Sequence, residues 1–147
     1  MEAVFVQPRE ETATEAIEAI GEEFSLFDDW EERYRYIIDL GRQLPPFPSV
    51  WCNEAHRVPG CQSQVWLQNY KEGERLYFSG TSDAAIVCGL VALLLRVYSG
   101  RSCAEIEKTS PSFLRDLGLV QALSTNRGNG VQAMARAIQK AAAIARG

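Results

Sequence analysis

Residues 62–98, QSQVWLQNYKEGERLYFSGTSDAAIVCGLVALLLRVY, decide the fold. Polar and apolar residues alternate from Gln62 to Leu67, and an apolar run returns at Leu76–Phe78 after the turn-forming residues Lys71–Glu74. This pattern predicts a β-hairpin. The stretch Ala84–Tyr98 that follows is apolar on nearly all sides, which predicts a helix at the centre of the fold. Its apolar run of about 14 residues is shorter than the ~18–20 that a membrane-spanning helix needs.

Side chains that cap helix N-termini precede most of the other expected helices. They are Thr12 or Thr14, Asp28 or Asp29, one of Thr81, Ser82 and Asp83 for the central helix, and then Ser102 and Ser110. The second helix is expected to end near Leu44, and a last helix is expected from about Gly130 to Ala145. Two helices, a hairpin and four helices indicate a single α+β domain, residues 1–147. Its small antiparallel sheet, of about three strands, is expected to be covered on one face by helices.

The composition is that of an ordinary globular domain. The chain has 147 residues, of which 46% are hydrophobic and 23% are charged, and this excludes disordered and low-complexity classes. The net charge is −4, so a nucleic-acid binder, which is normally basic, is disfavoured. The charge is uneven, because residues 1–40 hold twelve acidic and three basic residues. The acidic first helix is expected either to be a solvated face or to steer a basic partner.

The sequence predicts a cytoplasmic protein with reduced thiols. The N-terminus lacks the basic start and the long apolar run of a signal peptide. The four cysteines contain no C-x-x-C pair and His56 is the single histidine, so no metal site is expected. A phosphatase loop is excluded because no Arg lies six positions after any cysteine. A Cys–His hydrolase is disfavoured because His56 is too close in sequence to Cys61.

Cys61 is the cysteine best suited to chemistry. It follows Pro59 and Gly60, which shape a turn, and the hairpin begins directly after it. No acidic residue lies within six positions of it, and backbone N–H groups at such a turn can stabilise a thiolate. Cys88 and Cys103 are expected to be small buried apolar residues instead.

Four blocks of sequence resemble one family. They are WEERYRYIIDLGRQLP (30–45), VPGCQSQVW (58–66), SGTSDAAIV (79–87) and LSTNRGNGVQAM (123–134). Together they resemble the SufE family of sulfur-acceptor proteins. This resemblance implies a SufE/NifU-like α+β fold with a family core at residues 28–145, preceded by an acidic helix or extension at residues 1–27.

The resemblance also implies a function. Cys61 matches the family's acceptor cysteine, which takes sulfur from the persulfide of a PLP-dependent cysteine desulfurase. The family stimulates that enzyme and passes the sulfur to an iron–sulfur scaffold protein. Such a carrier needs no metal or cofactor, since PLP belongs to the desulfurase, and it is not expected to be a stand-alone enzyme. We expect its loop to hold Cys61 against an apolar pocket when free and to swing out on docking.

Five further residues are expected to support Cys61. Gly60 gives the loop backbone freedom, and Gln62 and Ser63 can hydrogen-bond a persulfide. Asp83 is expected to be an interface residue or the N-cap of the central helix. Arg127, expected just before the last helix, either contacts the desulfurase or the Cys61 loop, or else caps carbonyls or pairs with an acid.

Two other functions stay open. One is a regulator that stimulates the desulfurase allosterically with Cys61 dispensable, and the other is a scaffold that assembles a cluster itself, which the shortage of ligands disfavours. The family often has Lys or Arg where this chain has Cys88, so a second thiol near the site could resolve a persulfide or form a disulfide. We expect a monomer, with neither nucleic acid nor membrane as a partner.

Overall fold

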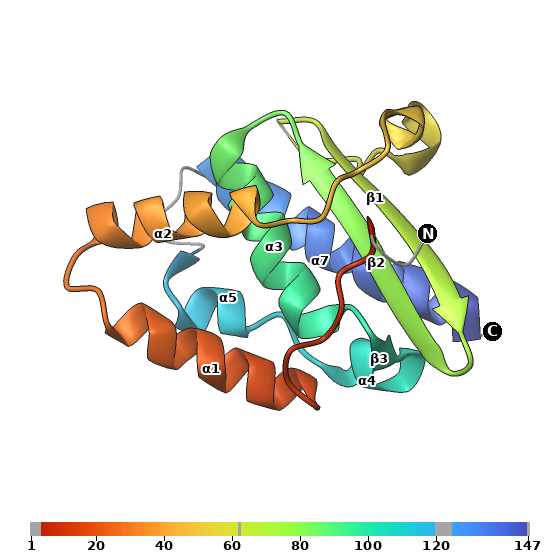
Figure 1. Ribbon diagram of the computed structural model, residues 1–147, viewed down its shortest axis with the longest axis horizontal. Helices are drawn as coiled ribbons and strands as arrows, with labels where there is room; N and C mark the ends of the chain where they lie inside the picture. The colour runs from red at the N-terminus through yellow and green to blue at the C-terminus, as the bar shows by residue number, and fades with distance from the viewer. Residues whose placement is uncertain (1–3, 62, 120–124, 147) are drawn as a thin grey trace.

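The computed structural model describes residues 4–61, 63–119 and 125–146, with only the backbone described at 125–129. The elements, shown in Figure 1, are α1 (Ala13–Ser25), α2 (Trp30–Arg42), the 3₁₀ helices η2 (Ser49–Trp51) and η3 (Glu54–His56), β1 (Val65–Glu72), β2 (Arg75–Ser82), α3 (Ala85–Tyr98), β3 (Arg101–Ser102), α4 (Cys103–Lys108), α5 (Phe113–Asp116) and α7 (Thr125–Arg146). In the part of the chain that the structure describes, the predicted order of two α-helices, a hairpin and four α-helices is confirmed, with η2, η3 and β3 in addition.

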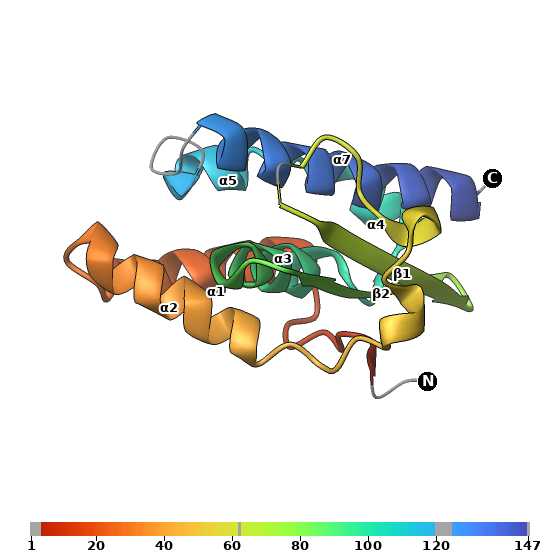
Figure 2. The same ribbon diagram turned by 90° about the horizontal axis from the view of Figure 1, so that it is seen from above.

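The three strands form an antiparallel sheet with the order β1-β2-β3. Successive residues of a strand point to opposite faces, so Leu76, Phe78 and Gly80 share one face of β2. Leu76 and Phe78 are almost fully buried there, and a Cβ on Gly80 would lie 2.8 Å from Val91 of α3. Figure 2 shows α7 on one side of the hairpin and the N-terminal segment on the other. The predicted small sheet with a helix-covered face is confirmed.

The central helix α3 packs closely against α2. A Cβ on Gly41 of α2 would lie 2.6 Å from the backbone nitrogen of Gly89 in α3, and a Cβ on Gly89 would overlap the carbonyl oxygen of Ile37. The two helices therefore meet backbone to backbone, which only glycine at these positions allows.

Residues 4–27 contribute to the packed core. Phe5 is 2% exposed, and α1 buries Ala16 and Ile20. The Val6 N–H donates to the Phe78 carbonyl of β2 at 2.8 Å, so the N-terminal segment continues along the edge of the sheet. The region predicted as an acidic helix or extension therefore contributes to the packed core from residue 4 onward.

One ion-pair network joins this region to α3. The Arg96 side chain is 8% exposed, and its Nη2 lies 2.8 Å from a carboxylate oxygen of Glu10 and 2.8 Å from one of Glu23. Tyr36 of α2 also donates to Glu23. Burial and the Glu23 carboxylate raise the pKa of Tyr36 to about 12. The hydrogen bond from Arg96 lowers the pKa of Glu23 although burial opposes this. Two of the N-terminal acids thus neutralise a buried arginine.

Two helix boundaries differ from the sequence predictions. α2 ends at Arg42, slightly before Leu44. α7 begins at Thr125 and not near Gly130, so Arg127 lies within the helix and the prediction that it precedes the helix is wrong. None of the described helices is long and apolar enough to cross a membrane.

Candidate functional site

A loop between η3 and β1 carries Cys61. At its first end the Val58 N–H donates to the Val65 carbonyl at 2.8 Å, which ties the loop to the start of β1. Gly60 has a φ of 86°, in the left-handed region that glycine adopts without strain. A Cβ on Gly60 would lie 3.5 Å from the Ala133 Cβ, so the loop tip lies against α7.

The Cys61 thiol is half-buried against the same helix. Its Sγ lies 3.6 Å from the Gly130 carbonyl oxygen, to which the S–H donates. Burial raises the pKa of the Cys61 thiol, while the positive charges of Arg57 and Arg136 oppose that rise. The contact is with a carbonyl and not with the N–H groups expected from the sequence. It therefore favours the protonated thiol over the nucleophilic thiolate.

Asp83, at the junction of β2 and α3, fixes the other end of the loop. Its Oδ1 accepts from the Gln64 N–H at 3.0 Å, and its own N–H donates to the Gln64 carbonyl at 3.3 Å. The Ser82 hydroxyl donates to the same carbonyl at 2.6 Å. The interpretation of Asp83 as the N-cap of the central helix is wrong, because the N-cap is Ala84 and no side chain makes a capping hydrogen bond there.

Of the remaining predicted residues, Gln62 lies outside the described residues. Ser63 is partly buried. The side chain of Arg127 also lies outside the described part of the chain, so its predicted contact stays a prediction.

Three residues that shape the Cys61 loop and its surroundings were not predicted from the sequence. Gly130 provides the carbonyl that accepts from the thiol, Gln64 provides the backbone groups that bind Asp83, and Arg136 provides a positive charge. The first two act through backbone atoms, which the residue type does not reveal. Arg136 had a weak signal, because α7 carries basic residues and no acidic ones.

The other thiols have different surroundings. Cys103 is 5% exposed, as predicted. Cys88 is only partly buried, and its Sγ lies 3.2 Å from the Ser82 carbonyl oxygen at the start of α3. Cys52 is exposed. Among the described residues, no group of three or more His, Cys, Asp or Glu side chains is placed to hold a metal ion.

The sequence matches the family model described as "SufE: Fe-S metabolism associated domain" over residues 18–142. The chain belongs to the SufE family. A SufE-like protein of Rhizobium meliloti (strain 1021) is 40% identical over 132 residues, which cover 86% of this chain and 94% of that protein. The sulfur acceptor protein CsdE of Escherichia coli (strain K12) is 38% identical over 127 residues, which cover 85% of this chain and 86% of CsdE.

The fold is shared with a solved structure. The solution structure of a hypothetical protein from Thermus thermophilus matches with a TM-score of 0.73 and 23% identity, over 88% of this chain and 95% of that one. The predicted membership of the SufE family and the predicted α+β fold are both confirmed.

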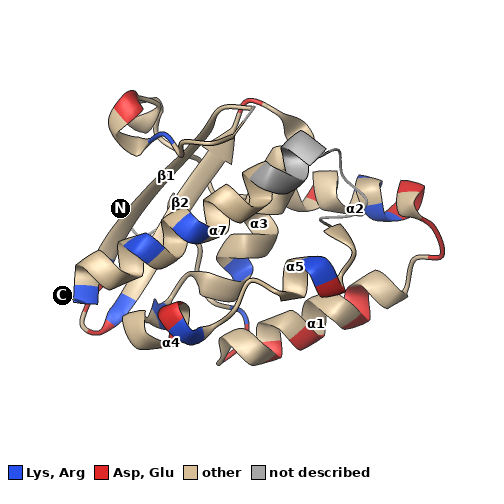
Figure 3. Cartoon of the chain, turned by 180° about the vertical axis from the view of Figure 1, so that it is seen from behind, with Lys and Arg blue, Asp and Glu red and all other residues tan. Residues whose placement is uncertain are grey.

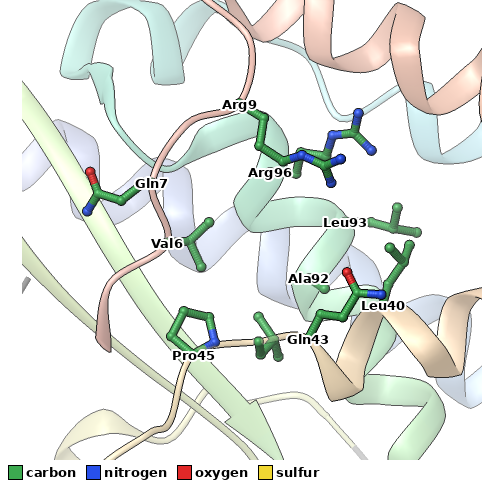
Figure 4. A pocket seen from close by; sticks show the side chains of 10 residues that line it. Val6, Gln7, Arg9, Leu40, Gln43, Pro45, Ala92, Leu93 and Arg96 are labelled. Carbon is green, nitrogen blue, oxygen red and sulfur yellow. The ribbon is translucent and has the colours of Figure 1, made fainter. Parts of the chain in front are cut away.

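A cavity of about 260 Å³ lies elsewhere in this SufE-family chain. It is lined by Val6 and Arg9 of the N-terminal segment, by Gln43 and Pro45 after α2, and by Arg96 of α3 (Figure 4). None of the residues that line it belongs to the Cys61 loop. The candidate site is therefore the outer surface at the loop and α7, and not this cavity.

Proposed function

We propose that this protein is a sulfur carrier that accepts persulfide sulfur on Cys61 from a PLP-dependent cysteine desulfurase and passes it on for iron–sulfur cluster assembly. The observation that carries the proposal is the placement of Cys61 on a loop with both ends tied to the sheet and with its thiol half-buried against α7. Membership of the SufE family, and the name of the E. coli relative as a sulfur acceptor, support it.

The transfer is a thiol–persulfide exchange. The Cys61 thiolate attacks the outer sulfur of the desulfurase persulfide, a new S–S bond forms to Cys61, and the S–S bond within the donor breaks. The donor cysteine leaves as a thiolate, and the outer sulfur keeps its proton. Sulfur changes carrier without net oxidation or reduction, so this chain needs no cofactor, and PLP stays with the desulfurase.

The exchange requires the loop to open. In the closed position the thiol donates to the Gly130 carbonyl, and burial raises its pKa. The sulfur is therefore poorly accessible and mostly protonated, whereas a nucleophile must be accessible and ionised. Moving the tip away from α7 would expose the thiol to water and remove the burial that raises its pKa, which favours the thiolate. Opening and activation of Cys61 are therefore one event.

The partners follow from the same chemistry. Accepting sulfur frees the donor's thiolate for its next turnover, which is how the carrier stimulates the desulfurase. Gly60, Gln62, Ser63, Asp83 and Arg127 form or border the surface that the donor meets. The second partner is an iron–sulfur scaffold protein that takes the sulfur from Cys61. The carrier acts in the cytoplasm as a monomer.

Mass spectrometry without reductant tests the proposal. The protein is incubated with a desulfurase, PLP and cysteine, and added sulfur is mapped to individual cysteines. Wild type is expected to gain sulfur on Cys61, and Cys61→Ser is expected to gain none there and to lose the stimulation of the desulfurase. Cys52→Ser, which removes an exposed thiol, is the matched control and should behave as wild type.

Two results would contradict the proposal. Stimulation that persists in Cys61→Ser would leave an allosteric regulator as the function. Sulfur that accumulates on Cys88 or Cys103 in place of Cys61 would assign the acceptor to another thiol.

A further inference from the structure

The helices α7 and α1 carry opposite charge. The sequence of α7 contains four basic residues and no acidic residue, whereas α1 contains four glutamates and no basic residue. Figure 3 shows basic positions in a row along α7 and acidic positions along α1. Because α7 is the helix that holds the Cys61 thiol, the basic side of the molecule is the side that carries the candidate site.

A groove lies on this basic side, between the start of α5 and α7. We call it the α5–α7 groove; its volume is about 320 Å³. Arg115 and Arg136 line it together with the hydroxyl groups of Ser110 and Ser112 and the amide of Gln132. None of the described acidic residues lines it. The polar side chains of the groove therefore offer hydrogen-bond donors and two positive charges.

The groove is next to the thiol. Gln132 and Arg136 follow Gly130 on the same helix, and six residues of helix span about 9 Å. Arg136 lies close enough to Cys61 for its charge to oppose the rise in the pKa of the thiol. Arg136 therefore faces both the groove and the site of sulfur transfer.

The cations at the groove are available to a ligand. Arg115, Arg136 and Lys140 are exposed, and within the described part of the chain none of them forms an ion pair. By contrast, Arg146 at the end of α7 pairs with Glu107. Lys140 lies one helical turn beyond Arg136, so the positive charge extends past the groove along α7. An extended basic strip of this kind fits an acidic protein segment better than a single small anion.

We propose that the α5–α7 groove docks an acidic segment of the protein that donates sulfur to Cys61. The donor, and not the acceptor, is the occupant, because the Cys61 thiol must be released from the Gly130 carbonyl before it can take up sulfur, and the groove borders the helix that holds this contact. The inference rests on the proposed function and adds the recognition surface to it. The acidic α1, with four glutamates and no basic residue, disfavours docking of the same acidic segment through that helix.

Charge reversal tests the docking surface. The rate of sulfur loading on Cys61 is measured with a desulfurase that loads the wild type, at subsaturating concentration, for Arg115→Glu/Arg136→Glu. The matched control is Arg35→Glu/Arg42→Glu, which makes the same change in net charge on the exposed face of α2. At about 0.1 M salt the groove variant is expected to load about tenfold more slowly, and the control within about twofold of wild type. At about 1 M salt, where charges are screened beyond about 3 Å, the difference should largely disappear.

A second measurement separates docking from thiol reactivity. Iodoacetamide is small and uncharged, so its rate of reaction with Cys61 reports the thiol alone. Because the charge of Arg136 lowers the pKa of the thiol, the groove variant is expected to be alkylated more slowly than wild type, but by much less than its about tenfold loss of loading. The milder Arg115→Gln/Arg136→Gln variant, with circular dichroism as a check of folding, should show a smaller loss of loading in the same direction.

The outcomes are distinguishable. Equal slowing of loading and of alkylation would overturn the inference, since the arginines would then act through the thiol. Normal loading of both groove variants would overturn it as well, while leaving Cys61 as the carrier. A wild-type protein that never gains sulfur on Cys61 would remove the proposed function itself, and the inference would fall with it.

Discussion

The crossing of α2 and α3 and the loop at residues 58–64 are held in place in opposite ways. At the crossing the two backbones touch, and a Cβ on Gly41 would lie 2.6 Å from the Gly89 nitrogen. In the loop the ends are held by hydrogen bonds at Val58 and Gln64 to the sheet and to Asp83. The tip between them rests on α7 through the Cys61 thiol.

This difference shows where motion costs least. A thiol is a weak hydrogen-bond donor, so releasing the tip of the loop loses little stabilising free energy. Separating α2 from α3 would instead open close-packed contacts along two helices. We therefore expect the movement that sulfur transfer needs to be confined to the loop. Hydrogen exchange at residues 58–64 that stays the same when the desulfurase binds would contradict this.

The largest effect is expected at the crossing. Gly89→Ala should lower the free energy of unfolding by about 3 kcal/mol or more, because the new methyl group would overlap the Ile37 carbonyl oxygen and the helices would have to move apart. Urea unfolding followed by circular dichroism measures the change.

The control for this substitution is Gly21→Ala in α1. Nothing lies within 4 Å of a Cβ at Gly21, so the loss of backbone entropy in the unfolded chain should stabilise the protein by about 0.5–1 kcal/mol. If the two substitutions gave similar unfolding free energies, the helices would not be in the tight contact described here.

A smaller effect is expected in the network around Arg96. Glu23→Gln should lower the free energy of unfolding by about 2 kcal/mol near neutral pH, because it leaves the buried guanidinium with one carboxylate in place of two. The pKa of Glu23 is lowered in the folded protein, so its contribution is present above its unfolded pKa and is lost as the pH falls through its folded pKa. Unfolding experiments from neutral to acidic pH should show the difference from wild type shrinking below about pH 4.

Glu22→Gln makes the same chemical change at the neighbouring position, which is exposed. It should change the unfolding free energy by less than about 0.5 kcal/mol. A difference between wild type and Glu23→Gln that grew toward acidic pH would show that the network does not stabilise the ionised carboxylate.

The features that the sequence predicted well are local. Thr12, Asp29 and Ser102 cap their helices through bonds to an N–H three residues along the chain, and the hairpin follows from alternation between neighbours. Cys61 could be singled out as the candidate because the residues that mark it are contiguous.

The features that were missed depend on contacts between distant residues. The thiol of Cys61 meets a carbonyl 69 residues away, and Arg96 meets carboxylates 86 and 73 residues away. Asp83 was expected to be an interface residue or to cap its own helix, and its carboxylate accepts from Gln64, 19 residues earlier. The side chain could serve either partner, and only the pairing of β1 with β2 brings Gln64 within its reach.

The smallest effect is expected at that bond. Asp83→Ala removes the acceptor for the Gln64 N–H at the end of the loop. Because Asp83 is exposed and water can replace it, the loss should be about 0.5–1 kcal/mol. If this energy helps to hold the loop closed, Cys61 should react with iodoacetamide about two- to fivefold faster at neutral pH. Peptide mass spectrometry of the alkylated protein gives the rate at Cys61 alone.

Asp39→Ala is the matched control, since it also removes an exposed aspartate, here from an ion pair with Arg42 in α2. It should leave the alkylation of Cys61 unchanged, because α2 is fixed by its crossing with α3 and not by surface charge.

Burial raises the pKa of the closed thiol, so any opening raises the thiolate fraction as well as access. If opening acts chiefly through ionisation, the alkylation rate of Cys61 in Asp83→Ala should exceed the wild-type rate most at pH values below the thiol pKa. The two rates should converge at high pH. Unchanged alkylation in Asp83→Ala at every pH would mean that the ends of the loop do not control the position of its tip. The proposal that the loop opens more easily than the α2–α3 crossing would then rest on the Gly130 contact alone.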